Sequence, residues 1–220
     1  MTAQDRINDY WTGRAPSYAE YQRQPARLAD DLAAWSQVWA GALPPAPLDV
    51  LDVGTGSGQV AGVLAGLGHR VTGIDLSPGM LEQARSTYGN VGFRLGDAVE
   101  PPFPPSSFDA VTGRYVMWTL RDPGAAVANW MRLLRPGGTV AVVDSTWFPD
   151  GPQSFYDPSV WEALPLAQAE SINQTAAVLE QAGLADVTVT PLTTIYELDE
   201  KYGVAPGHEL QTQYLITGHV

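Results

Sequence analysis

The sequence contains no cysteine among its 220 residues. This absence excludes disulfide bonds, thiolate nucleophiles and zinc sites built from thiolates. Basic residues are also few, because 12 Lys and Arg stand against 24 Asp and Glu, which gives a formal net charge of −12. A chain of that charge repels phosphate backbones and anionic membrane surfaces. We therefore expect no nucleic-acid partner and no membrane partner.

Long apolar runs are absent as well. No uninterrupted stretch approaches the roughly 18 apolar residues of a membrane span. The first ten residues, MTAQDRINDY, lack the basic-then-apolar layout of a secretory signal. On these grounds we expect a cytoplasmic protein.

The sequence does contain enough apolar residues to fill a core. Hydrophobic residues make up 45% of the chain and charged residues 16%, which is unlike a disordered protein. Residues 1–42 are typical of helix, and the proline-rich joint at 43–47 separates this leader from a domain over 43–220. The apolar residues of the leader that recur about every four positions are Leu28, Leu32, Trp35 and Trp39.

Seven short apolar runs bounded by turn residues predict strands. These runs are Leu48–Val53, Arg70–Ile74, Val91–Leu95, Phe108–Gly113, Thr139–Val143, Val187–Leu192 and Tyr214–Val220. Helix signals lie between them, such as Ser77-Pro78 and the capping box of Ser171 and Gln174. The alternation predicts an α/β fold with a doubly wound, mostly parallel, seven-stranded sheet. A substrate-side insert with Pro and Tyr is expected near 148–165.

The segment Leu51–Gly58, LDVGTGSG, runs from the first predicted strand through a glycine-rich loop into a helix. Glycines permit positive φ and let a ligand approach the backbone with no Cβ in between. Asp75 follows 21 residues after Gly54, at the end of the second predicted strand. This is close to the spacing of about 20 residues at which an acid meets a ribose. A tight turn needed only for packing is the alternative.

Two cofactor classes use such a loop. The dinucleotide fingerprint G-x-G-x-x-G would need a third glycine where Gln59 stands. Over roughly residues 10–145 the sequence instead resembles the class I S-adenosylmethionine-dependent methyltransferases. The first motif of that family is an acid, one further residue and then G-x-G-x-G. Asp52 and Gly54–Gly58 match this motif. The resemblance implies a Rossmann-like sheet, residues 1–42 as an N-terminal helical lid, and S-adenosyl-L-methionine as the cofactor.

The resemblance also implies residue roles. Asp75 matches the acid that binds the ribose hydroxyls. Asp97, in Gly96-Asp97-Ala98, matches the acceptor for the adenine amino group. For each of these residues, the alternative is a carboxylate that caps a helix or lies in a solvated turn. The segment Tyr10–Tyr18 resembles the lid of quinone-biosynthesis-like methyltransferases, with a plain amphipathic helix as the alternative. In that lid, Arg14 would pair with the cofactor carboxylate and Tyr18 would close over it. The cofactor-binding residues implied are Arg14, Tyr18, Asp52, Gly54, Thr55, Gly56, Gly58, Asp75, Leu76, Met80, Asp97, Ala98, Arg114 and Tyr115.

The methyl acceptor is expected to meet aromatic side chains, although packing would equally explain aromatic residues at strand ends. The expected acceptor-site residues are Tyr10, Trp118, Trp147, Phe148 and Tyr156. Many relatives carry a histidine near Thr119, and this chain has none there, so no catalytic residue is assigned. Asp144 and Tyr115 are the candidates for a base. Only scattered acids, Asp144, Asp150 and Asp157, follow the fifth predicted strand, and no metal is expected.

Together these features predict methyl transfer from S-adenosylmethionine to an O, N or C nucleophile of a small molecule, such as a secondary metabolite, by in-line displacement. Two alternatives stay open. One is a protein that binds S-adenosylmethionine without methyl transfer, and the other is an NAD-dependent oxidoreductase. A small-molecule acceptor is the expected partner, and a homodimer stays open.

Overall fold

The chain begins with two helices, α1 (Ala3–Gln22) and α2 (Pro25–Ala42). The computed structural model describes residues 1–148, 151, 156–205 and 209–220. A capping box starts α1, because the Thr2 hydroxyl accepts from the Asp5 N–H (3.1 Å) and the Asp5 carboxylate accepts from the Thr2 N–H (2.7 Å). Pro25 occupies the first turn of α2, where a missing N–H leaves no helical hydrogen bond unmade.

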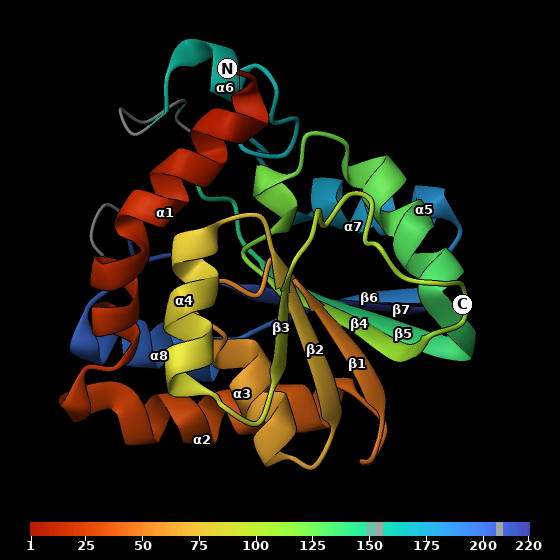
Figure 1. The fold of residues 1–220 in the computed structure, drawn as a ribbon, viewed down its shortest axis with the longest axis horizontal. Helices are drawn as coiled ribbons and strands as arrows, with labels where there is room; N and C mark the ends of the chain where they lie inside the picture. The colour runs from red at the N-terminus through yellow and green to blue at the C-terminus, as the bar shows by residue number, and fades with distance from the viewer. Residues whose placement is uncertain (149–150, 152–155, 206–208) are drawn as a thin grey trace.

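A seven-stranded sheet follows, with the strand order β3-β2-β1-β4-β5-β7-β6 (Figure 1). Its strands are β1 (Asp49–Val53), β2 (Arg70–Asp75), β3 (Gly92–Leu95), β4 (Phe108–Arg114), β5 (Leu134–Asp144), β6 (Ala185–Pro191) and β7 (Tyr214–His219). Neighbours among β1 to β5 pair in parallel, and β7 is antiparallel to both β5 and β6. The predicted mostly parallel, seven-stranded sheet is confirmed.

Helices connect the strands. They are α3 (Gln59–Gly66), α4 (Pro78–Thr87), α5 (Pro123–Leu133), α6 (Pro158–Trp161), α7 (Ile172–Ala182) and α8 (Thr193–Tyr202), with a short 3₁₀ helix at Met117–Thr119. Helices α4, α5, α6 and α7 each begin with a side chain that caps the first turn. The Ser77 hydroxyl accepts from the Met80 N–H (3.2 Å) at the start of α4. The predicted capping box of Ser171 and Gln174 is confirmed at α7. The sequence did not predict α8.

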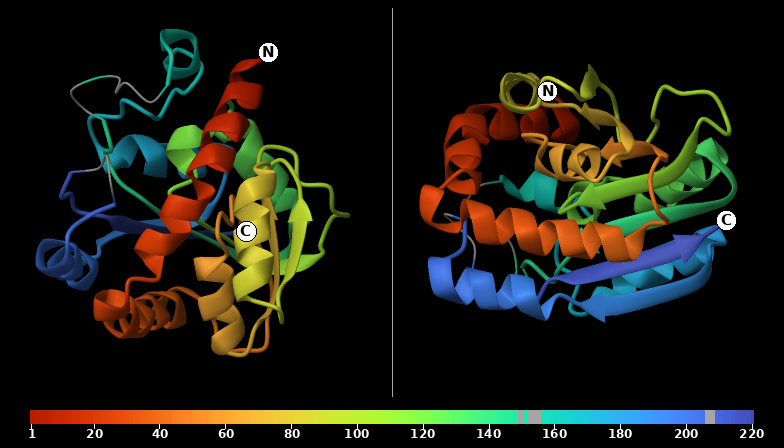
Figure 2. Two further views of the ribbon diagram at one scale, coloured as in Figure 1. Left: turned by 60° about the vertical axis from the view of Figure 1, so that its left-hand side comes forward. Right: turned by 90° about the horizontal axis from the view of Figure 1, so that it is seen from below.

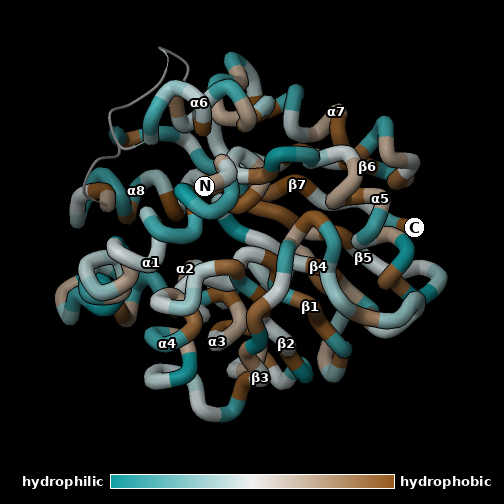
Figure 3. Tube along the Cα trace, turned by 45° about the horizontal axis from the view of Figure 1, so that its top comes forward, coloured by the Kyte–Doolittle hydropathy of each residue, from teal (hydrophilic) through white to brown (hydrophobic). Residues whose placement is uncertain are grey.

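The sheet lies between two layers of helices (Figure 2). One core packs β1, β4 and β5 against α5 and α7, around Trp130, Leu133 and Leu179. A second core on the opposite face packs the same strands against α2, α3 and α8, around Trp39 and Leu64. Hydrophobic residues accordingly gather along β1, β4, β5 and β7 in Figure 3. Burial on both faces explains why these strands read as nearly continuous apolar runs.

The buried face of α2 differs from the predicted one. Trp35 and Trp39 are buried, but Leu32 is 37% exposed. The residues that continue the buried row toward the start of the helix are Arg27 and Asp31, at 4% and 3% exposure. A spacing of four residues places 27, 31, 35 and 39 on one stripe, and the charges of the first two are neutralised by pairing with each other.

Two features of the fold create a site. Strands β1 to β4 end at the same edge of the sheet, and the chain reverses its winding between β1 and β4, which is where open α/β sheets bind ligands. Helix α1 runs beside α4 at this edge (Figure 1), joined to it by a hydrogen bond between the hydroxyls of Thr12 and Ser77 (2.9 Å). The first helix therefore covers the carboxyl ends of the strands.

Candidate active site

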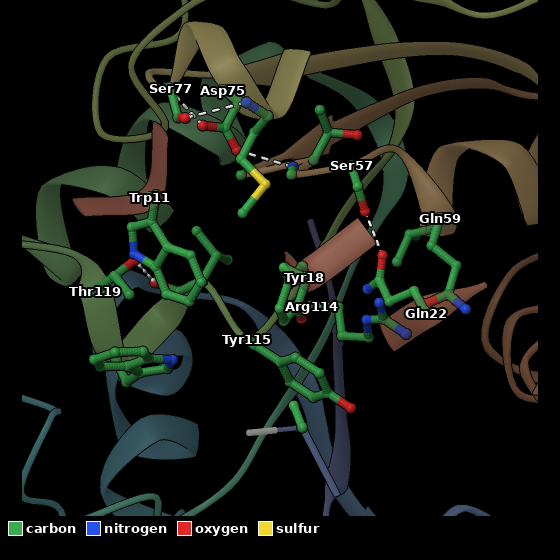
Figure 4. Close-up of a pocket in the computed structure, with 18 of the residues that line it drawn as sticks. Trp11, Tyr18, Gln22, Ser57, Gln59, Asp75, Ser77, Arg114, Tyr115 and Thr119 are labelled. Carbon is green, nitrogen blue, oxygen red and sulfur yellow. Dashed lines mark hydrogen bonds between the residues drawn. The ribbon is translucent and has the colours of Figure 1, made fainter. Parts of the chain in front are cut away.

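A cavity lies at the carboxyl ends of the central strands, and Figure 4 shows side chains from both halves of the chain around it. Its floor is the loop after β1 together with the ends of β2, β3 and β4. Residues of α1, α2 and α8 complete the wall. Six carboxyl groups but only two cations, Arg27 and Arg114, belong to the described residues that line it. The cavity is therefore strongly acidic.

The glycine loop brings bare backbone to the cavity. Gly54 has φ +60° and Gly56 has φ +55°, a region that favours glycine. A Cβ on Gly54 would come within 2.4 Å of the Val116 side chain, so no larger residue fits without a shift. Gly58, at φ +85°, is different: it does not line the cavity, and a Cβ there would meet Phe93 at 2.8 Å. Its smallness serves packing of the loop against β3 and α4.

Asp75 ends β2 and turns its carboxylate toward the loop. Its two oxygens accept from the backbone N–H groups of Gly56 and Ser77, each at 2.8 Å. Burial raises the pKa of this carboxyl, and the backbone donors partly oppose the shift. These donors fix the carboxylate at the cavity wall, where its remaining lone pairs can accept hydrogen bonds from a ligand.

Asp97 follows β3 and lines the next part of the wall. One of its oxygens accepts from the Val99 N–H (2.8 Å), and the other lies 3.4 Å from an Arg121 nitrogen. Ala98 and Met80 are buried beside it and supply apolar surface. Asp97 can therefore accept a hydrogen bond within its own turn and also accept one from a ligand in the cavity, so the two roles considered for it are compatible.

Asp52 lies beneath the glycine loop and is 1% exposed. It accepts from the hydroxyls of Thr55 (2.6 Å) and Thr112 (3.0 Å). Burial raises the pKa of its carboxyl to about 6, although these two hydroxyls act to lower it. An ionised Asp52 at neutral pH would be repelled by a phosphate and attracted by a cation.

Arg114 ends β4 on the far side of the loop from Asp75. Its guanidinium lies over the rings of Trp35 (4.7 Å to the centroid) and Tyr115 (4.9 Å). Within the described part of the chain no ion pair of Arg114 is found, whereas Arg27 pairs with Asp31 and with Asp199. Arg114 is therefore the cation of the described wall that stays available to a ligand.

The central part of the chain, which forms the floor of the cavity, is similar to known proteins. Residues 51–142 match the family model described as a methyltransferase domain. Over these residues the chain is similar to the class I methyltransferases. A demethylmenaquinone methyltransferase of Renibacterium salmoninarum is 34% identical over 131 residues, which cover 59% of this chain and 55% of that protein. An O-methyltransferase, cnsE, of Penicillium expansum is 32% identical over 180 residues, covering 76% and 64%. The matches thus span less than two thirds of these relatives' own length.

The fold of this chain is shared with solved structures. A SAM-dependent methyltransferase from Aquifex aeolicus superposes with a TM-score of 0.64 and 20% identity, covering 93% of this chain and 98% of that one. This likeness confirms the Rossmann-like sheet. In the described residues no helix is long and apolar enough to cross a membrane. Nor do these residues hold three or more His, Asp or Glu side chains grouped so as to bind a metal ion.

Most of the cofactor residues expected from the sequence come together at this cavity. Those that line it are Tyr18, Asp52, Gly54, Thr55, Gly56, Asp75, Leu76, Met80, Asp97, Ala98, Arg114 and Tyr115. Arg14 does not line it: its guanidinium lies 5.8 Å from the centre of the Tyr10 ring, one helical turn away. Other polar residues of α1 do line the cavity, among them Gln4, Asn8 and Gln22, and the Gln22 side chain accepts from the Ser57 hydroxyl.

The expected acceptor residues are divided between the cavity and a packed cluster. Trp118 and Trp147 line the cavity. Tyr10, Phe148 and Tyr156 do not, and the last two are buried in an aromatic cluster with Trp118 and Trp161. In this cluster Phe148 lies 5.2 Å from Trp118 and Tyr156 lies 5.5 Å from Trp161, between ring centres. It joins α1 to α6, so packing accounts for these aromatic residues.

The two candidate bases are both engaged. The Tyr115 hydroxyl donates to the Gln213 side chain, and burial raises the pKa of this phenol well above its ordinary value. Asp144 is fully buried and does not line the cavity. Its oxygens accept from the N–H groups of Ser145 (2.9 Å) and Trp118 (3.2 Å) and from the Trp147 indole. Asp157 pairs with Arg6 at the surface, and Asp150 lies outside the described residues.

Sequence reasoning missed several polar residues of the wall. They are Gln22, Arg27, Asp31, Ser57, Asp199 and Gln213. The one available signal was the spacing of Arg27 and Asp31, which is the i, i+4 spacing of a helical ion pair in line with two tryptophans. Asp199 and Gln213 come from α8 and the segment before β7, and no motif marks them.

Proposed function

We propose that this chain transfers a methyl group from S-adenosylmethionine to an oxygen, nitrogen or carbon atom of a small molecule. One observation carries the proposal: the order of side chains along the carboxyl edge of the sheet. Asp97 follows β3, Asp75 ends β2, the glycine loop follows β1, and Arg114 ends β4. The wall thus offers, in order, an acceptor for the adenine amino group, acceptors for two ribose hydroxyls, open backbone, and a cation for the amino-acid carboxylate.

The charge of the cavity supports the same cofactor. S-adenosylmethionine carries a sulfonium and an ammonium, and both are attracted by a wall that contains Asp31, Asp52 and Asp199 as well as the nucleoside acids. The pyrophosphate of a dinucleotide would meet those carboxylates beside a loop that has Gln59 in place of the third glycine. The NAD-dependent alternative is therefore disfavoured.

When bound, S-adenosylmethionine supplies an electrophilic methyl group on its sulfonium. The chain's own residues hold the ligands and keep out water. Asp75 and Asp97 would hold the nucleoside, the backbone of Gly54–Gly56 would approach the amino-acid chain, and Arg114 would hold its carboxylate. Trp118 and Trp147 form an apolar wall beyond Tyr115. Alignment of two reactants in a site closed to water removes much of the entropic barrier to displacement.

The proton of the acceptor is not taken by either candidate base in this geometry. Tyr115 is a neutral phenol whose proton points at Gln213. Gln213 does not take up that proton, because a neutral amide is a very weak base; its oxygen accepts a hydrogen bond from Tyr115 and its nitrogen donates to Asp199 (2.7 Å). The Asp144 carboxyl does not line the cavity, and its oxygens accept from backbone N–H groups. We therefore propose that catalysis comes chiefly from alignment. We also propose that the acceptor is a small molecule, in keeping with relatives named as a demethylmenaquinone methyltransferase and an O-methyltransferase.

Calorimetric titration tests the cofactor assignment. S-adenosylhomocysteine should bind the wild-type chain and NAD should not. Asp75→Ala should weaken S-adenosylhomocysteine binding by about 1.5–3 kcal/mol, the scale of hydrogen bonds to a charged group. Asp122→Ala, which removes the cap of α5 outside the cavity, is the matched control and should leave the affinity unchanged. Equal affinity in wild type and Asp75→Ala would contradict the ribose assignment.

A further inference from the structure

A buried polar network adjoins the cavity, and the nucleoside contacts make no use of it. It joins Arg27 of α2, Asp199 of α8, Gln213 before β7 and Tyr115 after β4. Arg27, Asp199 and Gln213 are 4%, 8% and 4% exposed. Unpaired polar groups at such depth are unfavourable, so the network is held together by mutual hydrogen bonds.

The bond directions along this network are fixed from the arginine outward. Arg27 Nη2 donates to Asp199 Oδ1 (3.0 Å), while Nε and Nη2 also donate to Asp31 (2.6 and 2.9 Å). The second oxygen of Asp199 accepts from Gln213 Nε2 (2.7 Å). The amide of Gln213 must therefore turn its oxygen to Tyr115, and the Tyr115 hydroxyl must donate to it. An arginine in α2 thus fixes, through two intervening residues, the direction of the hydrogen bond made by the Tyr115 hydroxyl.

Tyr115 needs such support because its backbone is unusual. Its φ is +59°, in the left-handed region that a bulky aromatic residue rarely adopts. Backbone strain of this kind persists only where the surroundings hold it, and it is concentrated at functional sites. On one side the Tyr115 ring meets Trp147 edge to face (4.9 Å between centres), and it also carries the Arg114 guanidinium at 4.9 Å. Figure 4 shows Tyr115 and Arg114 together at the cavity.

We infer that Gln213, oriented by Asp199 and Arg27, is a positioning residue that acts on Tyr115, and that Tyr115 in turn holds Arg114 in place for the amino-acid carboxylate of the cofactor. The inference rests on the proposed function, because it concerns one end of the proposed cofactor. It adds that the packing of α2 against α8 is coupled to the position of the Arg114 guanidinium. The network acts on the amino-acid end alone, since Asp75 and Asp97 are held by backbone donors of other elements.

Two ligands that share a nucleoside separate this role from general damage. S-adenosylhomocysteine has the amino-acid end, and 5′-methylthioadenosine lacks it. Gln213→Met keeps a similar volume but can neither donate to Asp199 nor accept from Tyr115. By calorimetry we expect it to weaken S-adenosylhomocysteine binding about tenfold, the order expected when a charged contact is misplaced. Its affinity for 5′-methylthioadenosine should stay within about twofold of the wild type.

Tyr115→Phe supplies the second variant and closes a double-mutant cycle. It keeps the ring and removes only the hydroxyl, so Gln213→Met should have little further effect in this background. Gln181→Met makes the same chemical change on α7, where the side chain is exposed and outside the cavity, and should leave the ratio of the two affinities unchanged. Thermal melting establishes that each variant is folded before titration.

The outcomes are distinguishable. Selective loss of S-adenosylhomocysteine binding in Gln213→Met, absent in the Tyr115→Phe background, would support the positioning role. Equal losses for both ligands, or no loss for either, would overturn it while leaving the proposed function intact. If the wild-type chain bound neither ligand, the proposed function itself would fail, and this inference with it.

Discussion

Arg114 has the surroundings of a carboxylate-binding cation. Two aromatic rings hold the plane of its guanidinium, at 4.7 and 4.9 Å, and leave the N–H edges for a ligand. We expect Arg114→Gln to weaken S-adenosylhomocysteine binding by about 1.5–3 kcal/mol, because it removes hydrogen bonds to a charged group. Arg114→Lys should have an intermediate effect, since an ammonium keeps the charge but lacks the planar fork. Calorimetry with both variants measures the difference.

The control for this prediction is Arg14→Gln, which changes the arginine expected from the resemblance to hold the carboxylate. Because Arg14 does not line the cavity, the substitution should leave the affinity for S-adenosylhomocysteine near that of the wild type. A large loss in Arg14→Gln with none in Arg114→Gln would reverse the assignment and return the carboxylate to α1.

Local motifs explain which site residues could be predicted. Asp75 and Asp97 each follow a strand at a fixed distance from a recognisable turn. The local sequence therefore marks each acid and also predicts its place at the edge of the sheet. Gln213 and Asp199 lie about a hundred residues beyond that stretch, and they reach the cavity only because β7 inserts beside β5 and α8 packs on α2. Such long-range pairing leaves no periodic signal in a single sequence.

At the scale of elements, α1 packs chiefly on α4 and α6 and makes few contacts with the strands of the sheet. It is joined to α4 by Thr12 and Ser77, to the glycine loop by Gln22 and Ser57, and to α6 by the exposed pair of Arg6 and Asp157. Hydrogen bonds at a partly exposed surface open more readily than a packed core. We expect amide exchange over residues 10–21 to slow when S-adenosylhomocysteine is added, because the ligand would bury Trp11 and Tyr18 further.

Hydrogen-exchange mass spectrometry checks this expectation, with α7 as the internal reference because no residue of that helix lines the cavity. Equal changes in both segments would indicate global stabilisation instead of ordering of α1. Unchanged protection over 10–21 would mean that this segment is fixed core and that the lid hypothesis is wrong.

Elements were predicted best where capping and periodicity agreed. The helix at α7 was found from its capping box, and the strands from their apolar runs. Helix α8 was missed because it opens Thr-Thr-Ile-Tyr, residues that favour strands, and its helical state comes from packing on α2 through Ile195 and Leu198. The stripe on α2 was misassigned for a related reason, because Arg27 and Asp31 are buried by pairing that only the folded chain provides.

At the scale of the whole molecule, the carboxyl groups fall into two populations with opposite effects on stability. Surface acids such as Asp49 and Asp109 pair with arginine, and their pKa values are lowered in the fold. The stability that they contribute is lost only as the pH falls below that of ordinary carboxyls, about 4. Asp52 and Asp144 are buried without a cation in contact, and burial raises the pKa of each. Their contribution to the free energy of unfolding therefore decreases as the pH rises.

Asp144 gives the clearest test, because burial raises its pKa to about 7 from an ordinary 3.8 despite the N–H donors around it. Between these two values the folded chain keeps a proton that the unfolded chain has lost. The free energy of unfolding should therefore decrease as the pH rises through this window, by up to about 1.4 kcal/mol per pH unit, and level off above about pH 8. Asp52, with a pKa of about 6, adds a decrease of the same sign that ends at a lower pH.

Asp144→Asn removes only the contribution of Asp144. Urea unfolding of both chains from about pH 5 to about pH 8 should show the stability advantage of the wild type shrinking as the pH rises. A constant difference across that range would mean that Asp144 is already ionised in the folded protein, with the N–H groups of Trp118, Ser145 and Trp147 outweighing its burial.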